Sequence, residues 1–205
     1  LVIEDDPYGD LYFQAPPPPS LLALAPQIPG SMNWLAHCGS LSKIMSPGLR
    51  LGWLVAPPAL LAQTTMCKQF SDANTSTLAQ ATAAAYLQSG RLPAAVEKVR
   101  TTYAARARQM GACLQRELGA AVEFSEPHGG MFFWVRLTGD TGYTQDAAAY
   151  ARQCVEQLVA FVPGAAFFAE QPDPSFLRMS FATANEANIA EGVARMAQAL
   201  RQTPC

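Results

Sequence analysis

The first third of the chain alternates between short apolar runs and polar loops, which is typical of strands joined by turns. Leu1-Val2-Ile3 is an apolar, β-branched run of the kind found in buried parallel strands. An acidic, turn-rich segment, residues 4–9, follows this run. Further strands are predicted over residues 33–39 and 51–56, with a polar loop that contains glycine and proline between them.

Helical patterns come next along the chain. Pro57-Pro58 opens a predicted helix, because proline suits the first helical turn. A second helix is expected from about residue 75 to residue 88, with Asn74 or Thr75 as its N-cap. A long helical pattern then covers residues 93–118. We place a domain boundary near residue 91, inside this helix or just before it, which gives a first domain of residues 1–90 and a second of residues 91–205.

The pattern of predicted elements changes in the second domain, where short strands alternate with helices. Strands are predicted over residues 121–124, 131–137, 159–162 and 176–181, and helices over residues 144–158 and 186–201. The fold class is therefore α/β.

Composition excludes several classes of protein. The chain has 205 residues and a net charge of −2, which gives no basic footprint for nucleic acid. No apolar stretch approaches the length of about 18 residues that a membrane span needs. The five cysteines are odd in number and lack CxxC spacing, so we expect reduced thiols in a cytoplasmic protein. Charged residues make up only 15%, against about 25% in an ordinary domain, which suggests a surface covered by other protein.

The start of the sequence is unusual, since it has no initiator methionine and opens directly on a predicted buried strand. A buried strand rarely begins a protein. We therefore expect a fragment of a longer polypeptide.

The densest chemical signal lies between residues 39 and 53. Lys43 follows a predicted strand, with the hydroxyls of Ser40 and Ser42 just before it and Arg50 seven residues after it. A lysine at a strand end can act as a nucleophile that forms a Schiff base, and hydroxyls with a guanidinium suit a phosphate ester. The alternative is a serine- and glycine-rich loop with ordinary surface cations.

A second signal is Asp5-Asp6-Pro7-Tyr8. An acid at a strand's C-terminal end, three residues before a tyrosine, is suited to hold a protonated pyridine nitrogen while the phenol bonds a ring oxygen. The alternative is an acidic turn in which either aspartate bonds backbone amides.

Together, in this order, the two segments resemble the fold type I pyridoxal-phosphate-dependent aminotransferases of class I/II. The resemblance is strongest to the kynurenine/2-aminoadipate and aromatic aminotransferases. It implies that Lys43 is the Schiff-base lysine, and that Asp5 rather than Asp6 is the partner of the pyridine nitrogen. It also implies that Tyr8 bonds the phenolic oxygen of the cofactor. The phosphate ligands would be Ser40 and Arg50, with Ser42 as a less certain third.

The resemblance continues to the C-terminus through Pro127-x-Gly129-Gly130-Met131-Phe132 and Val162-Pro163-Gly164. Arg178 would grip the α-carboxylate of the substrate, the alternative being a surface ion pair. The side chains of residues 131–133 would either wall the substrate pocket or belong to the β-core. Neither His37 nor His128 has other metal-ligating residues near it at the spacing of a metal site, and no metal is expected.

The resemblance implies a partial large domain, a mostly parallel sheet with helices, followed by a small α+β C-terminal domain. The implied activity is ping-pong transamination between an L-amino acid and a 2-oxo acid, most simply 2-oxoglutarate, in a cytoplasmic homodimer. Family members run to about twice this length, so we expect the isolated chain to bind the cofactor weakly and to transaminate poorly.

Two other functions stay open. One is the effector-sensing domain of a winged-helix transcription regulator, although such regulators usually carry Tyr-Asp where this chain has Pro7-Tyr8. The other is a non-catalytic remnant that keeps the small domain for assembly.

Overall fold

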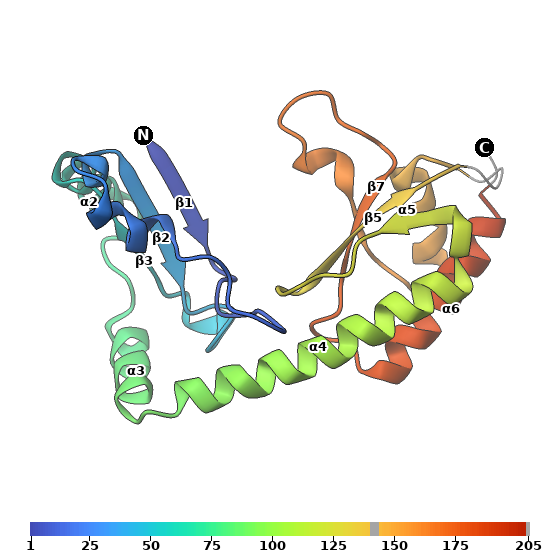
Figure 1. Cartoon of the computed structure of the whole chain (residues 1–205), viewed down its shortest axis with the longest axis horizontal. Helices are drawn as coiled ribbons and strands as arrows, with labels where there is room; N and C mark the ends of the chain where they lie inside the picture. The colour runs from blue at the N-terminus through green and yellow to red at the C-terminus, as the bar shows by residue number, and fades with distance from the viewer. Residues whose placement is uncertain (140–143, 204–205) are drawn as a thin grey trace. The chain divides into compact units, whose positions relative to one another are not determined.

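A computed structural model describes residues 1–139 and 144–203 (Figure 1). The chain divides into two compact units, Leu1–Arg100 and Thr101–Cys205. The division falls inside the long helix α4, Leu92–Glu117, and so lies ten residues beyond the boundary expected at residue 90. The assignment of the units to a cofactor domain and a small domain stays a prediction. No helix in the described ranges is both long enough and apolar enough to cross a membrane.

The first unit, called unit 1, is built on a three-stranded sheet in the order β1-β2-β3. Its strands are β1 Val2–Asp6, β2 Leu35–Ser40 and β3 Gly52–Val55. β1 and β2 are parallel, and β2 and β3 are antiparallel. Because the pairing is parallel, the carboxyl ends of β1 and β2 lie side by side at the same end of the sheet.

Two details of β1 differ from the sequence prediction. The acidic residues 4–6 belong to the strand, because ladder hydrogen bonds to β2 continue as far as Asp6. The run Leu1-Val2-Ile3 is exposed, at 63, 52 and 66%, where burial was predicted. The reason is that β1 is an edge strand of unit 1.

Unit 1 contains three complete helices and the N-terminal part of α4. The three helices are α1 Leu21–Leu24, α2 Pro58–Ser71 and α3 Thr77–Gln88, with 3-10 turns at Ala25–Gln27, Ser31–Asn33 and Pro47–Leu49. Of the three, α1 packs on β2. The predicted N-cap of α3 is wrong by one or two residues, since Ser76 is the residue whose Oγ accepts from the Ala79 amide, at 3.3 Å.

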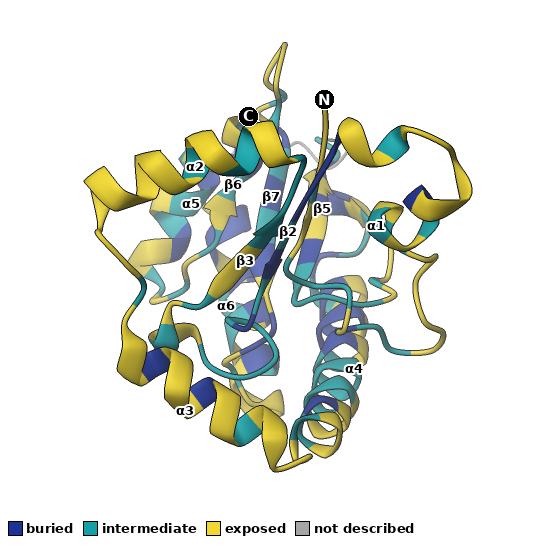
Figure 2. Cartoon of the chain, turned by 90° about the vertical axis from the view of Figure 1, so that its left-hand side faces the viewer, coloured by how far each residue is buried: buried dark blue, intermediate teal, exposed yellow. Residues whose placement is uncertain are grey.

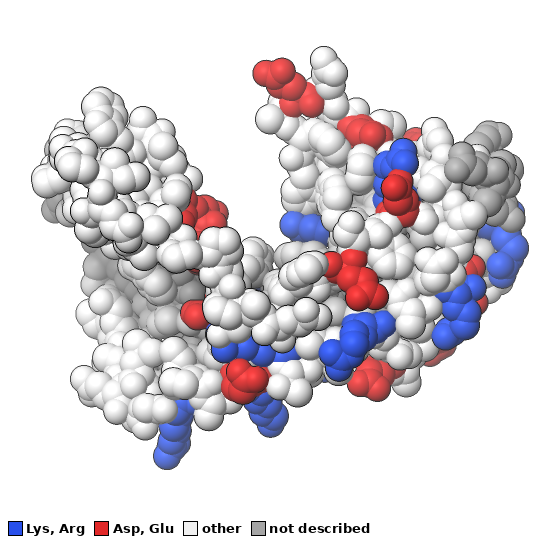
Figure 3. Space-filling model, in the orientation of Figure 1, with Lys and Arg blue, Asp and Glu red and all other residues white. Residues whose placement is uncertain are grey.

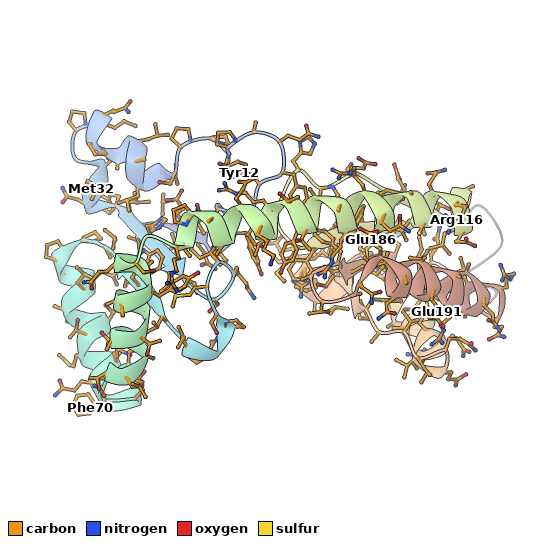
Figure 4. The ribbon with its side chains drawn as sticks, turned by 90° about the horizontal axis from the view of Figure 1, so that it is seen from below. Tyr12, Met32, Phe70, Arg116, Glu186 and Glu191 are labelled. Carbon is orange, nitrogen blue, oxygen red and sulfur yellow. The ribbon has the colours of Figure 1, made fainter. Side chains whose placement is uncertain are left out.

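The helices α2 and α3 bury very little of their surface. No residue of α2 is buried, and α3 buries only alanines (Figure 2). Phe70 is 84% exposed and stands at the surface of α2 (Figure 4). On the face drawn in Figure 3, the upper part of unit 1 is almost entirely free of charge. Unit 1 therefore exposes several large apolar side chains on these helices, among them Met66, Phe70 and Leu78.

The second unit, called unit 2, is a four-stranded antiparallel sheet packed against helices. Its strands, in the spatial order β4-β5-β7-β6, are β4 Val122–Phe124, β5 Phe132–Leu137, β7 Phe176–Ser180 and β6 Val162–Pro163. Its helices are α5 Ala147–Glu156 and α6 Glu186–Arg201, the C-terminal part of α4, and 3-10 turns η4 Gly119–Ala121 and η5 Gly164–Phe167. The bounds predicted for α6 are confirmed.

The core of unit 2 follows from the alternation along β5, where Phe133, Val135 and Leu137 are buried and their neighbours are not. Tyr150 is fully buried, and its hydroxyl donates to the Met196 carbonyl at 2.8 Å, which ties α5 to α6. The strand predicted over residues 159–162 is wrong for most of its length. Leu158 has a positive φ of 60° and the Val159 amide donates to the carbonyl of Cys154, so the chain is still completing a helix end there.

Candidate active site

The candidate site begins where β1 and β2 end together. Asp5 pairs in register with Cys38, and Asp6 with Gly39. Ligands of α/β sheets bind outside the carboxyl ends of parallel strands. The two aspartates differ, because Asp6 Oδ1 accepts from the Gly9 amide at 2.7 Å and so closes the turn after β1. The Asp5 carboxylate has no hydrogen bond or ion pair to a described residue. Asp5 is therefore the aspartate that is open to a ligand.

Lys43 lies on a tight turn directly after β2. The turn is closed by the Met45 amide, which donates to the Leu41 carbonyl at 2.9 Å. Leu41 is buried and its own amide donates to Leu51 at 3.1 Å, so the loop is fastened to the start of β3. Lys43 is half-buried and its Nζ lies 5.7 Å from the centroid of the Tyr8 ring. No described carboxylate forms an ion pair with it.

The hydroxyls of Ser40 and Ser42 differ in their hydrogen bonds. Ser40 Oγ donates to the Leu51 carbonyl at 3.2 Å and accepts from the Ser42 amide at 3.0 Å. Its single proton is therefore engaged, and Ser40 must release Leu51 before it can donate to a phosphate. The Ser42 hydroxyl has no partner among the described residues. Ser42, expected to be the less certain ligand, has the freer donor.

Arg50 ends the 3-10 turn Pro47–Leu49 in a left-handed conformation, with φ 54°. Strained backbone of this kind is costly for a residue with a Cβ and is concentrated at functional sites. One guanidinium nitrogen donates to the Pro47 carbonyl at 3.1 Å, and no described carboxylate pairs with the group. The remaining donors are available for an anion.

Behind these residues, Glu4 holds the sheet to α1. Its carboxylate accepts from the Leu21 amide at 2.6 Å, from the Leu22 amide at 3.2 Å and from His37 Nδ1 at 2.8 Å. Desolvation alone would raise the pKa of the Glu4 carboxyl, but these hydrogen bonds together lower it. His37, which pairs in register with Glu4, is thus part of the support behind the site.

Close packing on the same sheet requires a glycine at position 39. A Cβ there would lie 2.2 Å from the Trp53 ring, which covers Gly39 from β3. A cavity of about 390 Å³ opens beside this ring. Its lining includes Asp6, His37, Ser40 and Trp53 together with residues 16–18.

Arg178 belongs to unit 2, where it lies on β7 opposite Trp134 of β5. Its guanidinium carbon is 4.2 Å from the Phe132 ring centroid and 4.3 Å from that of Phe167. Its Nε is buried with no hydrogen-bond partner. An unpaired buried donor costs about 1–3 kcal/mol, and such groups in a native fold call for a functional explanation. The predicted alternative for Arg178, a surface ion pair, is absent among the described residues.

The structure separates the three residues that were expected either to wall a pocket or to fill the core. Phe133 is fully buried and belongs to the core, where its ring meets Phe124 and Phe181 edge to face. Phe132 faces Arg178. Met131 uses its carbonyl to accept from the Phe181 amide, at 3.2 Å. Sequence reasoning missed Phe167, whose signal was its place three residues after Gly164 in the Val-Pro-Gly motif.

Comparison with known proteins gives a consistent result. The protein-family profile for aminotransferase class I and II matches residues 1–196. A 2-aminoadipate transaminase from Thermus thermophilus is 38% identical over 203 residues, which are 98% of this chain and 49% of that relative. A Rhodobacter capsulatus relative, the HTH-type transcriptional regulator TauR, is 31% identical over 98% of this chain and 40% of its own length.

The fold is also similar to solved structures. The crystal structure of the T. thermophilus alpha-aminoadipate aminotransferase LysN, complexed with N-(5'-phosphopyridoxyl)-L-leucine, matches with a TM-score of 0.88 and 37% identity. The match covers 98% of this chain and 50% of that one. The chain spans about half the length of the curated relatives it matches.

Proposed function

Because the chain belongs to the class I and II aminotransferase family, we propose that it carries out pyridoxal-phosphate-dependent transamination of an L-amino acid with a 2-oxo acid. The acceptor is 2-oxoglutarate and the mechanism is ping-pong. One observation supports the proposal: three charged groups without an ion pair to a described residue flank the carboxyl ends of β1 and β2 along the chain. Asp5 is the next-to-last residue of β1, and Lys43 follows the end of β2 by three residues. Arg50 comes two residues before Gly52, which pairs with Ser40 at the end of β2.

The charges of these residues fit the cofactor. Pyridoxal phosphate has an anionic phosphate, an aldehyde that an amine attacks and a ring nitrogen that accepts a proton. Arg50 offers uncommitted donors of the right charge for the phosphate, and Lys43 offers the amine. Asp5 offers a carboxylate that no described residue neutralises. The phosphate also takes Ser42 and, once its bond to Leu51 is released, Ser40.

When bound, the cofactor supplies an electron sink for the charge that develops at the α-carbon of the amino acid. Asp5 would hold the proton on the ring nitrogen, and Tyr8 would bond the phenolic oxygen. Lys43 forms no ion pair with a described carboxylate, so no such bond holds its Nζ away from the substrate. Its amine would accept the α-proton and return it. Arg178 holds the α-carboxylate and thereby selects amino acids over simple amines.

The likeness to the 2-aminoadipate transaminase and to kynurenine/alpha-aminoadipate aminotransferases favours 2-aminoadipate or an aromatic amino acid as the donor. A cytoplasmic location is proposed from the cysteines, which are free among the described residues, and a homodimer is proposed from the family resemblance. The second candidate, an effector-sensing regulator domain, is supported by the likeness to TauR. It predicts cofactor and amino-acid binding without turnover.

The test is a two-stage assay at high protein concentration, so that slow conversion is measurable. The chain saturated with pyridoxal phosphate is mixed with L-2-aminoadipate, freed of amino acid by gel filtration, and then given 2-oxoglutarate. Glutamate formed in the second stage is expected, because a ping-pong enzyme retains the amino group between the two substrates.

Lys43→Ala should form no glutamate, since it lacks the amine that moves the proton. Lys68→Ala is the matched control, because Lys68 is exposed and pairs with Asp72 at 2.8 Å on α2. Equal glutamate from Lys43→Ala and from the unaltered chain would contradict the proposal. Stoichiometric binding of the cofactor with no glutamate at all would favour the regulator.

A further inference from the structure

Two aromatic rings enclose the guanidinium of Arg178. Phe132 comes from β5 and Phe167 from η5, and their ring centroids lie 4.2 and 4.3 Å from the guanidinium carbon. At these distances both rings attract the cation through their π faces. The two contacts come from separate parts of the chain and meet on one side chain.

The atoms of Arg178 show which part of the group is left for a ligand. Nε is buried, and no nitrogen of the guanidinium bonds a described residue. Among the three nitrogens of this guanidinium, only Nε is buried without a hydrogen-bond partner in the described part of the chain. The two Nη atoms also lack a partner, so they must be accessible to solvent. Arginine donors all lie in the guanidinium plane. The open donors of Arg178 are therefore its two terminal Nη groups.

We propose that Phe132 and Phe167 form a clamp that positions Arg178, and that the clamp presents the paired Nη groups end-on to a substrate carboxylate. The inference rests on the proposed role of Arg178 as the carboxylate anchor. A long, flexible side chain loses conformational freedom when it binds, and ordering it in advance reduces that cost. The two rings also keep water from Nε, which leaves the terminal edge as the place where an anion is held.

Two further aromatic rings, of Trp134 and Phe176, support Phe167 in the clamp. Trp134 meets Phe167 edge to face at 5.7 Å and stacks on Phe176 at 5.3 Å. η5 approaches these rings closely, because it begins at Gly164. A Cβ at that position would lie 2.6 Å from Phe176 Cβ and 2.7 Å from the Trp134 ring. Gly164 thus permits the approach that places Phe167 over Arg178.

The test uses NMR of the full chain, with acetate as the probe and acetamide as its neutral counterpart. The Nε–Hε signal of Arg178, assigned by its loss in Arg178→Lys, is followed for exchange with water and for its shift on titration. The variants are Phe132→Leu and Phe167→Leu. Phe168→Leu is the matched control, since Phe168 packs on Trp134 and Phe176, while the described cation–π contacts of Arg178 are with Phe132 and Phe167. Phe167 is 48% exposed, so its replacement leaves the core intact.

In the unaltered chain we expect slow exchange of Nε–Hε and a saturable shift with acetate but not with acetamide. Each clamp variant should speed the exchange and weaken acetate binding about two- to fivefold, the effect of removing one cation–π contact. Phe168→Leu should match the unaltered chain, and Phe167→Tyr, which keeps a ring, should restore both properties.

Unchanged exchange and acetate affinity in Phe167→Leu would overturn the clamp and leave Arg178 as an anchor. Absence of acetate binding at Arg178 in the unaltered chain would overturn the anchor and the clamp together. Neither outcome bears on Lys43, whose role is tested separately by glutamate formation.

Discussion

Replacing Glu4 by glutamine tests how β1 and β2 are held in place beside Asp5. The Glu4 carboxylate accepts three hydrogen bonds, from the amides of Leu21 and Leu22 and from His37. Glutamine keeps the shape of the side chain but removes its charge and replaces one acceptor by a donor. At least one of the three bonds is lost, and the others become neutral.

The magnitude follows from the strength of these bonds. A hydrogen bond to a charged group contributes about 1.5–3 kcal/mol and a neutral one about 0.5–1.5 kcal/mol. We expect Glu4→Gln to destabilise the attachment of α1 by at least about 1.5 kcal/mol, the loss of one bond to a charged group, which is roughly a tenfold or larger change in its opening equilibrium. Amide hydrogen exchange at Leu21 and Leu22 measures this opening directly.

The same bond set gives a pH dependence with a definite sign. The pKa of the Glu4 carboxyl is lowered from its ordinary value of 4.5 in the folded chain. Its contribution is therefore fully present above that value and is lost as the pH falls through the lower pKa of the folded state. The protection factors of Leu21 and Leu22 should fall with acid in the unaltered chain and depend little on pH in Glu4→Gln.

The control is Glu123→Gln, because Glu123 is exposed in unit 2 and pairs with Arg136 there. It should leave the protection of Leu21 and Leu22 unchanged. Equal protection of Leu21 and Leu22 in Glu4→Gln and in the unaltered chain would show that α1 is held by something other than the Glu4 carboxylate.

Three further predictions concern other parts of the molecule. Arg178→Ala should raise the activation free energy for amino acids by about 1.5–3 kcal/mol, measured as a fall in their second-order rate constant. The rate constant for simple amines should be unchanged in the same kinetic assay. Tyr150→Phe should reduce the free energy of unfolding by about 1 kcal/mol in urea titrations, because it removes the buried hydrogen bond to Met196. The exposed edge strand β1 should promote self-association, and Ile3→Lys should reduce it in sedimentation velocity experiments.

Much of the fold was predictable because periodicity is a local property. The amphipathic pattern of α6 gave its bounds correctly, and the apolar runs located β2 and β3 to within two residues. Burial of β1 was not predictable in the same way. The run Leu1-Val2-Ile3 has the composition of a central strand, but composition does not say whether a neighbouring strand is present to cover it.

The candidate site was predictable where a motif carries its own geometry. Lys43 follows β2 as predicted, because a strand end and a glycine–serine turn are encoded within a few residues. The difference between Asp5 and Asp6 appeared only with the hydrogen bond that closes the turn at Gly9. Phe167 was missed, because its contact with Arg178 joins segments that no local pattern connects.

The central claim is that Lys43 is the residue that binds pyridoxal phosphate covalently. The sequence contains three lysines, Lys43, Lys68 and Lys98, so reduction with borohydride at saturating cofactor followed by peptide mapping compares every lysine in the chain. Reduction makes the attachment of a lysine to the cofactor permanent. We expect the label on Lys43, with little on Lys68 or Lys98. A chain that is labelled stoichiometrically on Lys68 or Lys98, with Lys43 unmodified, would contradict this claim.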